Sequence, residues 1–289
     1  MTTPPVSDFK LLTPEDYLAA RRVGIMGPPN SFKTTSLLTW PHAAEEPLVI
    51  MSYPGEKGWE SIPHDAPGVL PLIWQVADVE KVSPHAVVRQ VESTTWEVLS
   101  GSGRYKGLKT FAGDGLHKLY YWYYKRRRTE IADWWLGPRE MKGDPEAVAQ
   151  NERQLDLTAY GSVTSGAHAD FMLYVSKVLS STVPYVVMTM WEESERDDPE
   201  NIRSKAMHLF PALPGKLATR IVGEFGTMVY AQVGLPNPRG ERKGEWQLRP
   251  AGKVWGVGVK APFNIAKGLP ESIEQSFPAL ERALKGVKR

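Results

Sequence analysis

The chain has 289 residues, of which 42% are hydrophobic and 24% are charged, and its formal net charge at pH 7 is +2. This length is enough for one large or two small globular domains. A net charge so close to zero excludes a uniformly basic surface, so any nucleic-acid contact has to be local, and the absence of cysteine excludes disulfides and thiolate metal sites.

Neither a signal peptide nor a membrane span is predicted. The first ten residues, MTTPPVSDFK, lack an apolar core, and nowhere do eighteen apolar residues follow one another. Together with the lack of cysteine, this favours a soluble protein of the cytoplasm. The first predicted element is a short helix, TPEDYLAA, which Thr13 caps and in which Pro14 takes the first position.

From residue 22 onward, apolar runs of strand type alternate with helical patterns, which is typical of an α/β fold with a mainly parallel sheet. The predicted strands are 22–26, 47–53, 69–75, 107–112 and 184–190. The predicted helices cover 33–40, 83–100, 115–127 and 159–181. Residues 129–158 are mostly charged and weakly periodic, so we expect a mobile insertion there.

The pattern changes after residue 226. GTMVYAQVG, a turn-rich segment and WQLRP predict an antiparallel β-hairpin, KVWGVGVK predicts a third strand, and a final helix is expected over 270–286. We therefore expect a single domain over residues 1–289, in which 226–289 form a C-terminal hairpin and helix extension.

The segment GPPNSFKTT, residues 27–35, lies between the first predicted strand and a predicted helix. Gly27, Lys33 and Thr34 have the spacing of the phosphate loop G-x-x-x-x-G-K-[ST]. In this loop, backbone N–H groups and the lysine bind the phosphates, and the hydroxyl binds Mg²⁺. Phe32 stands in place of the second glycine, and the alternative is a Gly-Pro-Pro turn before an ordinary helix. Because both flanking elements are present, we predict that ATP binds to Gly27, Pro28, Pro29, Asn30, Ser31, Phe32, Lys33, Thr34 and Thr35.

A phosphate loop predicts further polar groups at the ends of neighbouring strands. Asp114 ends the strand in GLKTFAGDG and is expected to hold Mg²⁺ together with Thr34, although Asp-Gly is also a common turn signal. Thr189, in VPYVVMTMWEE, is expected to sense the terminal phosphate; alternatively it satisfies a backbone group at the strand end. The six histidines form no close cluster with acidic residues along the sequence, so no histidine metal site is predicted.

Several segments along the chain occur in a recognisable order: GIMGPPNSFKTT, VIMSYPGEKGW, LKTFAGDGLHKL, VPYVVMTMWEESE and LFPALPGKLATRIVGEFGTMVYA. Over most of residues 20–280 the sequence thereby resembles phage-encoded RecA-like P-loop ATPases, AAA-domain proteins of the single-strand annealing and recombination type. The resemblance implies a RecA-like core, Mg²⁺-dependent ATP hydrolysis and a homo-oligomer. It also implies action on single-stranded DNA, with a phage single-strand-binding protein, in the cytoplasm of the host cell.

The resemblance further implies which carboxylate orients the attacking water. RecA-like proteins carry it just past the second strand, where this chain has Glu56, with Glu60 as the second choice. In the AAA+ group it directly follows the metal-binding aspartate, and here the residue after Asp114 is Gly115. The alternative is that Glu56 merely belongs to a Pro-Gly turn.

Two more positions follow from the resemblance. RecA-like ATPases commonly insert a basic side chain from a late strand of the neighbouring subunit, and Lys260, at the end of KVWGVGVK, matches this position better than Lys253. A cation supplied in this way speeds phosphoryl transfer. Such proteins often have a histidine two residues after the sensor threonine, whereas this chain has Trp191.

Two segments are candidates for contact with single-stranded DNA. YYWYYKRRR, residues 120–128, combines aromatic rings with cations, and the predicted hairpin carries Arg239, Arg242, Lys243 and Arg249. The rings of residues 120–124 are alternatively core or subunit contacts. The loop expected at 191–211 is too acidic for a strong phosphate contact.

The sequence therefore predicts an ATPase that assists phage DNA recombination, single-strand annealing or replication. One alternative is an assembly or scaffold protein that nucleotide controls and that hydrolyses ATP weakly, and another is a helicase or packaging motor. Strong stimulation of hydrolysis by single-stranded DNA favours the first function, whereas assembly with nucleotide that is indifferent to DNA favours the second.

Overall fold

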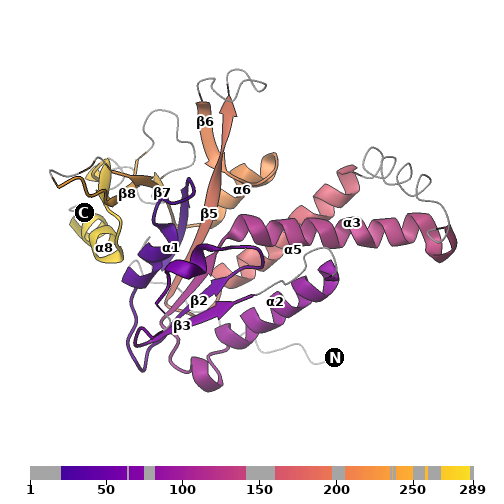
Figure 1. Ribbon diagram of the computed structural model, residues 1–289, viewed down its shortest axis with the longest axis horizontal. Helices are drawn as coiled ribbons and strands as arrows, with labels where there is room; N and C mark the ends of the chain where they lie inside the picture. Colours follow the sequence, from indigo (N-terminus) through magenta and orange to yellow (C-terminus); the bar gives the residue numbers. More distant parts are fainter. Residues whose placement is uncertain are drawn as a thin grey trace, which may run out of the picture.

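The computed structural model describes residues 21–63, 65–74, 82–140, 160–196, 206–234, 236, 239–249, 258–259 and 268–286. Within these residues a single large sheet, with helices packed against both of its faces, forms the centre of the molecule (Figure 1). The described part of the chain contains no helix that is both long and apolar enough to cross a membrane. The short helix predicted at Thr13 lies outside the described residues.

The sheet is mainly parallel, and its strands follow the order β10-β8-β7-β1-β5-β4-β2-β3. Neighbours from β7 to β3 pair in parallel, whereas β8 and β10 extend the sheet antiparallel. The bounds are β1 (Arg22–Gly27), β2 (Leu48–Ser52), β3 (Val69–Ile73), β4 (Thr110–Asp114), β5 (Tyr185–Arg196), β7 (Thr227–Val233), β8 (Gly244–Gln247), β9 (Gly258–Val259) and β10 (Ser272–Glu274). This is the predicted α/β fold class, with a mainly parallel sheet, a C-terminal antiparallel hairpin and a terminal helix.

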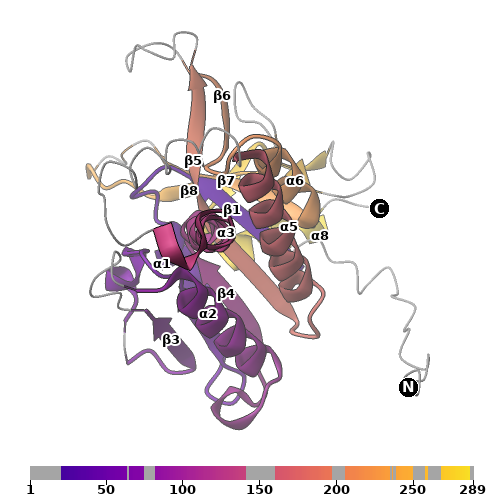
Figure 2. The same ribbon diagram turned by 90° about the vertical axis from the view of Figure 1, so that its right-hand side faces the viewer.

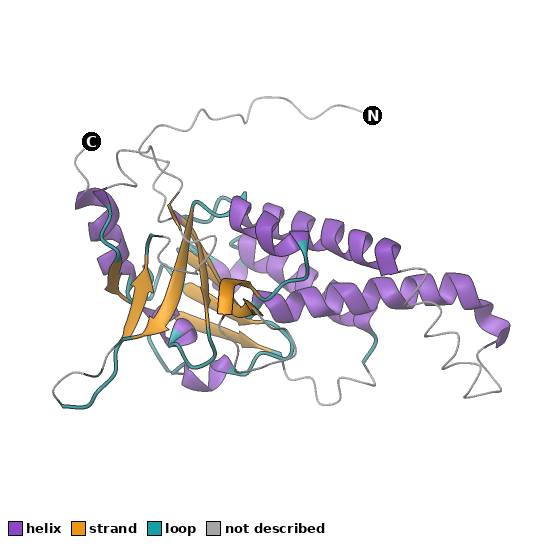
Figure 3. Ribbon diagram, turned by 90° about the horizontal axis from the view of Figure 1, so that it is seen from above, coloured by secondary structure: helices purple, strands orange, loops and turns teal. Residues whose placement is uncertain are grey.

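Alternate residues of the inner strands face opposite cores, which explains their uninterrupted apolar runs. Val49 and Met51 of β2 belong to one core, with α2 (Pro84–Leu99), α3 (Leu116–Glu140), α5 (Tyr160–Leu179) and α6 (Lys216–Glu224). Leu48 and Ile50 belong to the other, with η2 (Leu37–Thr39) and α8 (Phe277–Gly286). The long helices lie in front of the strands in Figure 2 and extend beyond the end of the sheet in Figure 3.

The helix predicted over 115–127 is longer in the structure, because α3 continues to Glu140. The middle of α3 is held to α5 by ion pairs of Arg126 and Arg127 with Asp170 and by the packing of Ile131 against Val163. Residues 129–140 are therefore helical rather than part of an irregular insertion. Residues 141–159 lie outside the described part of the chain, so mobility there stays a prediction.

The segment after Thr189 is a hairpin rather than the expected loop. β5 continues to Arg196 and pairs antiparallel with β6 (Ala206–Pro211), and this hairpin projects beyond the sheet in Figure 1. Pairing between the two strands satisfies backbone groups that an irregular loop would leave to solvent.

The C-terminal part differs from the prediction in two ways. The last helix begins at Phe277 rather than at residue 270, because residues 272–274 form β10 against β8. β7 forms the predicted hairpin with β8, but it also pairs in parallel with β1. The start of the predicted extension therefore belongs to the central sheet.

Arg22 anchors the start of β1 to the end of α5. Its guanidinium donates hydrogen bonds to the carbonyl oxygens of Leu179, Ser181 and Pro184 and of its neighbour Arg21. These include carbonyls at the C-terminal end of α5, which have no partner within the helix. Burial lowers the pKa of Arg22 to about 10, so the side chain is charged at neutral pH.

We expect Arg22→Ala to lower the free energy of unfolding by about 2–3 kcal/mol, because several carbonyls lose a charged donor at once. The free energy of unfolding of Arg22→Lys should lie between those of the native protein and Arg22→Ala, since lysine keeps the charge but lacks the planar guanidinium with its several N–H donors. Urea denaturation of the three proteins measures this. A change of less than about 0.5 kcal/mol in Arg22→Ala would mean that the anchor contributes no more than an ordinary surface residue.

Candidate functional site

The predicted site residues that the structure describes meet where the parallel strands end. The phosphate-loop segment follows β1, Asp114 is the last residue of β4, and Thr189 lies in β5, which runs between β1 and β4. Glu56 follows β2, the next strand along. Carboxyl ends of parallel strands are where α/β folds bind their ligands.

Phe32 adopts the backbone conformation for which a glycine is normally needed. Its φ is 59°, in the left-handed region, and Asn30 has a similar φ of 61°. Such a conformation in a residue other than glycine costs about 1–3 kcal/mol. Phe32 is 44% exposed, so its ring lies at the surface. The backbone at this position therefore keeps the left-handed conformation without having to bury the ring. Gly27 is constrained differently, because an added Cβ would lie 2.3 Å from the Ala231 carbonyl oxygen.

Lys33 is the first residue of α1 (Lys33–Ser36) and is folded back into the loop. Its ammonium donates to the carbonyl oxygens of Gly27, at 2.9 Å, and Pro28, and to the Ser31 hydroxyl at 3.2 Å. Burial lowers the pKa of Lys33 to about 8, and the nearby carboxylates of Asp114, Glu56 and Glu192 oppose this shift. The Lys33 ammonium is thus hydrogen-bonded to carbonyl oxygens of the loop, and a phosphate oxygen can take their place as its partner.

Thr34 and Asp114 form a pair of hard oxygen donors. The Thr34 hydroxyl donates to Asp114 Oδ2 at 2.9 Å, and a Cβ added at Gly58 would lie 2.4 Å from the Thr34 hydroxyl and 3.0 Å from Asp114 Oδ2. Within the described residues no group of three or more His, Asp or Glu side chains forms a metal site. Mg²⁺ commonly takes one or two protein oxygens and completes its shell with phosphate and water, and this pair fits that mode.

Thr189 supports Asp114 from the other side. Its hydroxyl donates to Asp114 Oδ1 at 2.5 Å and accepts the N–H of Gly115 at 3.0 Å. Burial raises the pKa of Asp114 to about 6, while the hydrogen bond from Thr189 opposes the rise and the charge of Glu56 adds to it. Thr189 therefore positions the carboxylate, and its role as a sensor of the terminal phosphate stays a prediction.

Glu56 has one carboxylate oxygen held and the other unused. Oε1 accepts the N–H groups of Lys57 and Gly58 at 3.0 and 3.1 Å, whereas Oε2 is buried and has no hydrogen-bond partner among the described residues. A Cβ at Gly115 would lie 2.6 Å from Oε2, so the glycine after Asp114 makes room for Glu56. The second choice, Glu60, is exposed on η3 (Gly58–Ser61).

Two residues near the loop were missed by sequence reasoning. Glu192, counted only among the acids of residues 191–211, hydrogen-bonds to Tyr230 and acts electrostatically on Lys33. His117, three residues after Asp114, stacks on Trp191. The spacing of His117 from Asp114 was visible in the sequence, but its contact with Trp191 depends on the position of β5. Lys260 and Lys253 lie outside the described residues.

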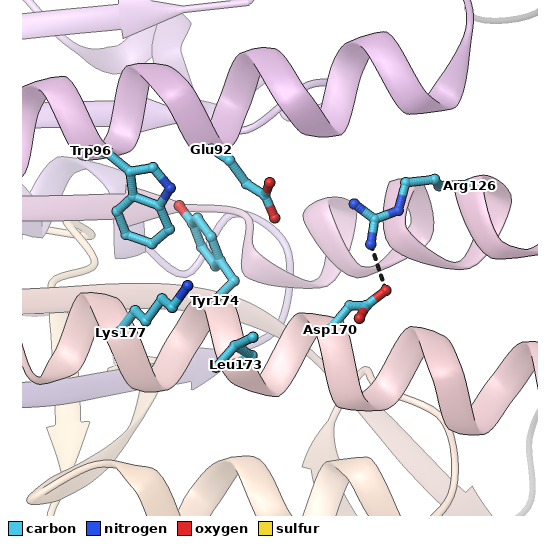
Figure 4. Close-up of a pocket in the computed structure, with 7 residues that line it drawn as sticks. All are labelled: Glu92, Trp96, Arg126, Asp170, Leu173, Tyr174 and Lys177. Carbon is cyan, nitrogen blue, oxygen red and sulfur yellow. Dashed lines mark hydrogen bonds and ion pairs between the residues drawn. The ribbon is translucent and has the colours of Figure 1, made fainter. Parts of the chain in front are cut away.

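Most of the aromatic and basic stretch at residues 120–128 has a structural role, as the alternative interpretation held. Tyr120, Trp122 and Tyr123 are buried. Arg126 pairs with Asp170 in a pocket between α2, α3 and α5, lined by Glu92, Trp96, Arg126, Asp170, Leu173, Tyr174 and Lys177 (Figure 4). Tyr121 alone of the five rings is exposed, at 47%, and the Lys125 ammonium lies 4.7 Å from its centroid.

No family model matches the chain, and no curated protein matches it. Solved structures with some similarity include a KaiC-like protein, PH0186, from the hyperthermophilic archaeon Pyrococcus horikoshii OT3, with 11% identity, a TM-score of 0.35, and coverage of 80% of this chain and 79% of that one. Another is the flagellar accessory protein FlaH from Methanocaldococcus jannaschii, with 10% identity, a TM-score of 0.32, and coverage of 84% and 90%. The fold assignment therefore rests on the strand order and loop geometry of this chain.

The buried carboxylate of Asp114 predicts a pH-dependent stability. Because its pKa rises from 3.8 to about 6 on folding, the native state binds more protons in this window and stability falls as pH rises through it. At pH 8 we expect Asp114→Asn to be more stable than the native protein by about 2–3 kcal/mol, and this difference should shrink as the pH is lowered toward 4. Urea denaturation in EDTA measures it. A variant less stable than the native protein at pH 8 would contradict this account.

Proposed function

We propose that this chain binds ATP with Mg²⁺ at residues 27–35 and hydrolyses it. The observation that carries the proposal is the hydrogen bond between Thr34 and the buried Asp114, formed beside Lys33 and Glu56. Thr34 and Asp114 would hold Mg²⁺, which supplies charge neutralisation on the phosphate oxygens when it is bound. Backbone N–H groups of the loop would hold the phosphates.

The roles of the two remaining side chains follow from their surroundings. Lys33 carries a positive charge in the loop at neutral pH, since its pKa of about 8 lies above 7, and it would pair with the β- and γ-phosphate oxygens. Glu56 is oriented by two backbone N–H groups through Oε1, so its unpaired Oε2 is the atom that would accept a proton from the attacking water.

We further propose that the ATPase is a homo-oligomer that acts in phage DNA recombination, single-strand annealing or replication in the host cytoplasm. The support is the sequence resemblance to phage-encoded RecA-like ATPases, which also suggests Lys260 as a residue donated to the neighbouring site and a phage single-strand-binding protein as partner. For single-stranded DNA itself, the exposed Tyr121 with Lys125, and the exposed Arg242 and Lys243, are the candidate contacts.

Lys33→Ala should lose nucleotide affinity because it removes the cation in the loop. Glu56→Gln should bind ATP normally and hydrolyse it about 10²–10⁴-fold more slowly, because the amide cannot accept a proton. Glu60→Gln is the matched control and should behave as the native protein. Binding is measured by calorimetry and turnover by phosphate release. Normal turnover by Glu56→Gln, or unchanged affinity in folded Lys33→Ala, would refute the assignment.

Single-stranded DNA should accelerate ATP turnover, and Tyr121→Ala should weaken DNA binding about 5- to 100-fold through the loss of a stacking surface. Tyr160→Ala provides the control, because Tyr160 is another exposed tyrosine of the helical layer, at 54%. Turnover with and without DNA, and fluorescence anisotropy of labelled oligonucleotides, provide the measurements. Nucleotide-dependent assembly that ignores DNA would instead favour an assembly or scaffold protein.

A further inference from the structure

His117 is a histidine beside the phosphate loop that the proposed function leaves without a role. It is the second residue of α3, and its Nδ1 accepts the backbone N–H of Trp191 at 3.4 Å. Its ring stacks on the Trp191 indole, with centroids 4.7 Å apart and planes 28° apart. The Lys118 ammonium lies 4.5 Å from the same indole centroid. The imidazole is therefore held in one orientation.

The position of this ring places it next to the candidate site. Trp191 pairs in register with Gly27, the first residue of the loop. His117 follows Asp114 by three residues, at the start of the helix that leaves β4. Because β5 runs between β1 and β4, the ring lies at the strand ends that carry the loop and Asp114. Lys33 is close enough for its charge to act on His117.

The hydrogen bond from Trp191 fixes where the imidazole carries its proton. Burial, together with the charges of Lys118 and Lys33, lowers the pKa of His117 to about 3, so the ring is neutral at physiological pH. In a neutral ring whose Nδ1 accepts a hydrogen bond, the proton lies on Nε2. Nε2 is buried and has no partner in the described structure. A buried donor usually has a hydrogen-bond partner in a folded protein, and at this position, beside the loop and Asp114, a bound ligand can provide one.

We propose that the Nε2–H group of His117 donates a hydrogen bond to the terminal phosphate of bound ATP. The inference rests on the proposed function and adds a residue that distinguishes ATP from ADP. The terminal phosphate is the natural partner, since Asp114 and Glu56 mark the end of the site at which the metal and the attacking water would be held, and His117 follows Asp114 by three residues. Because the ring is neutral at physiological pH, it would donate this hydrogen bond from Nε2 without carrying a charge.

Two isosteric variants separate the two nitrogens. His117→Asn keeps an acceptor at the place of Nδ1 for the Trp191 N–H but has no donor at the place of Nε2, whereas His117→Gln can put an amide N–H there. With Mg²⁺ present, we expect His117→Asn to bind a non-hydrolysable ATP analogue about 10- to 100-fold more weakly than the native protein, as for the loss of a hydrogen bond to a charged group. ADP affinity should stay within about twofold, and His117→Gln should recover most of the loss.

Calorimetry with the ATP analogue and with ADP gives the required ratio, and thermal unfolding checks that each variant is folded. Should His117→Asn fail to fold, His117→Phe, which keeps the stacking, provides the same comparison. Unchanged affinity for the ATP analogue, or equal losses for the analogue and ADP, would overturn the role of His117. Lys33→Ala, measured alongside, tests the nucleotide site independently, because its loss of ADP binding supports the proposed function whatever His117 does.

Discussion

The buried carboxylate of Asp114 is the group on which the geometry of the site depends. It is 2% exposed, and each of its oxygens accepts a hydroxyl hydrogen bond, from Thr34 on one side and Thr189 on the other. The bond from Thr34 connects β4 to α1, the helix that follows β1, and the bond from Thr189 connects β4 to β5. In the sheet, β5 lies between β1 and β4. Because Thr189 also accepts the Gly115 N–H, the start of α3 is fixed by the same network. A buried charge is tolerated only when it is hydrogen-bonded in this way.

The site is arranged at a cost to the stability of the protein alone. Glu56 and Glu192 act on the same cation, Lys33, as Asp114 does, and Phe32 is held in a left-handed conformation. The costs are the burial of the charged Lys33 and Asp114, the repulsion between the carboxylates of Glu56 and Asp114 and the backbone conformation of Phe32. Unfavourable features of this kind concentrate at functional sites, where a ligand relieves them. Magnesium and phosphate groups would supply the opposite charges and the hydrogen-bond partners that these residues lack, so ligand binding should stabilise the fold by mass action.

The order of strand, loop and helix around residues 27–35 and the parallel core were predictable from local pattern. Strand, loop and helix follow one another at the required spacing, and the substitution at Phe32 changes the side chain without changing the backbone shape. By contrast, the link from Thr189 to Asp114 depends on the insertion of β5 between β1 and β4, which no local pattern reveals. For the same reason the sequence left Glu192 and His117 unassigned.

The helical layer marks another limit of sequence reasoning. Arg126 and Arg127 form part of a charged run that resembles a nucleic-acid contact, but both pair with Asp170, more than forty residues away. The length of α3 also depends on α5, because Ile131 gains its apolar neighbour Val163 only when the two helices are packed together. Long-range partners of this kind decide whether an aromatic and basic stretch is core or surface.

We propose above all that Thr34 and Asp114 form the protein side of a magnesium site for ATP. Calorimetry of a non-hydrolysable ATP analogue, with Mg²⁺ and with EDTA, tests it most directly when the native protein is compared with Asp114→Ala. The account predicts that Mg²⁺ tightens binding at least about tenfold in the native protein, equivalent to about 1.4 kcal/mol, and much less in the variant. Equal dependence on Mg²⁺ in both proteins, or none in the native protein, would contradict it.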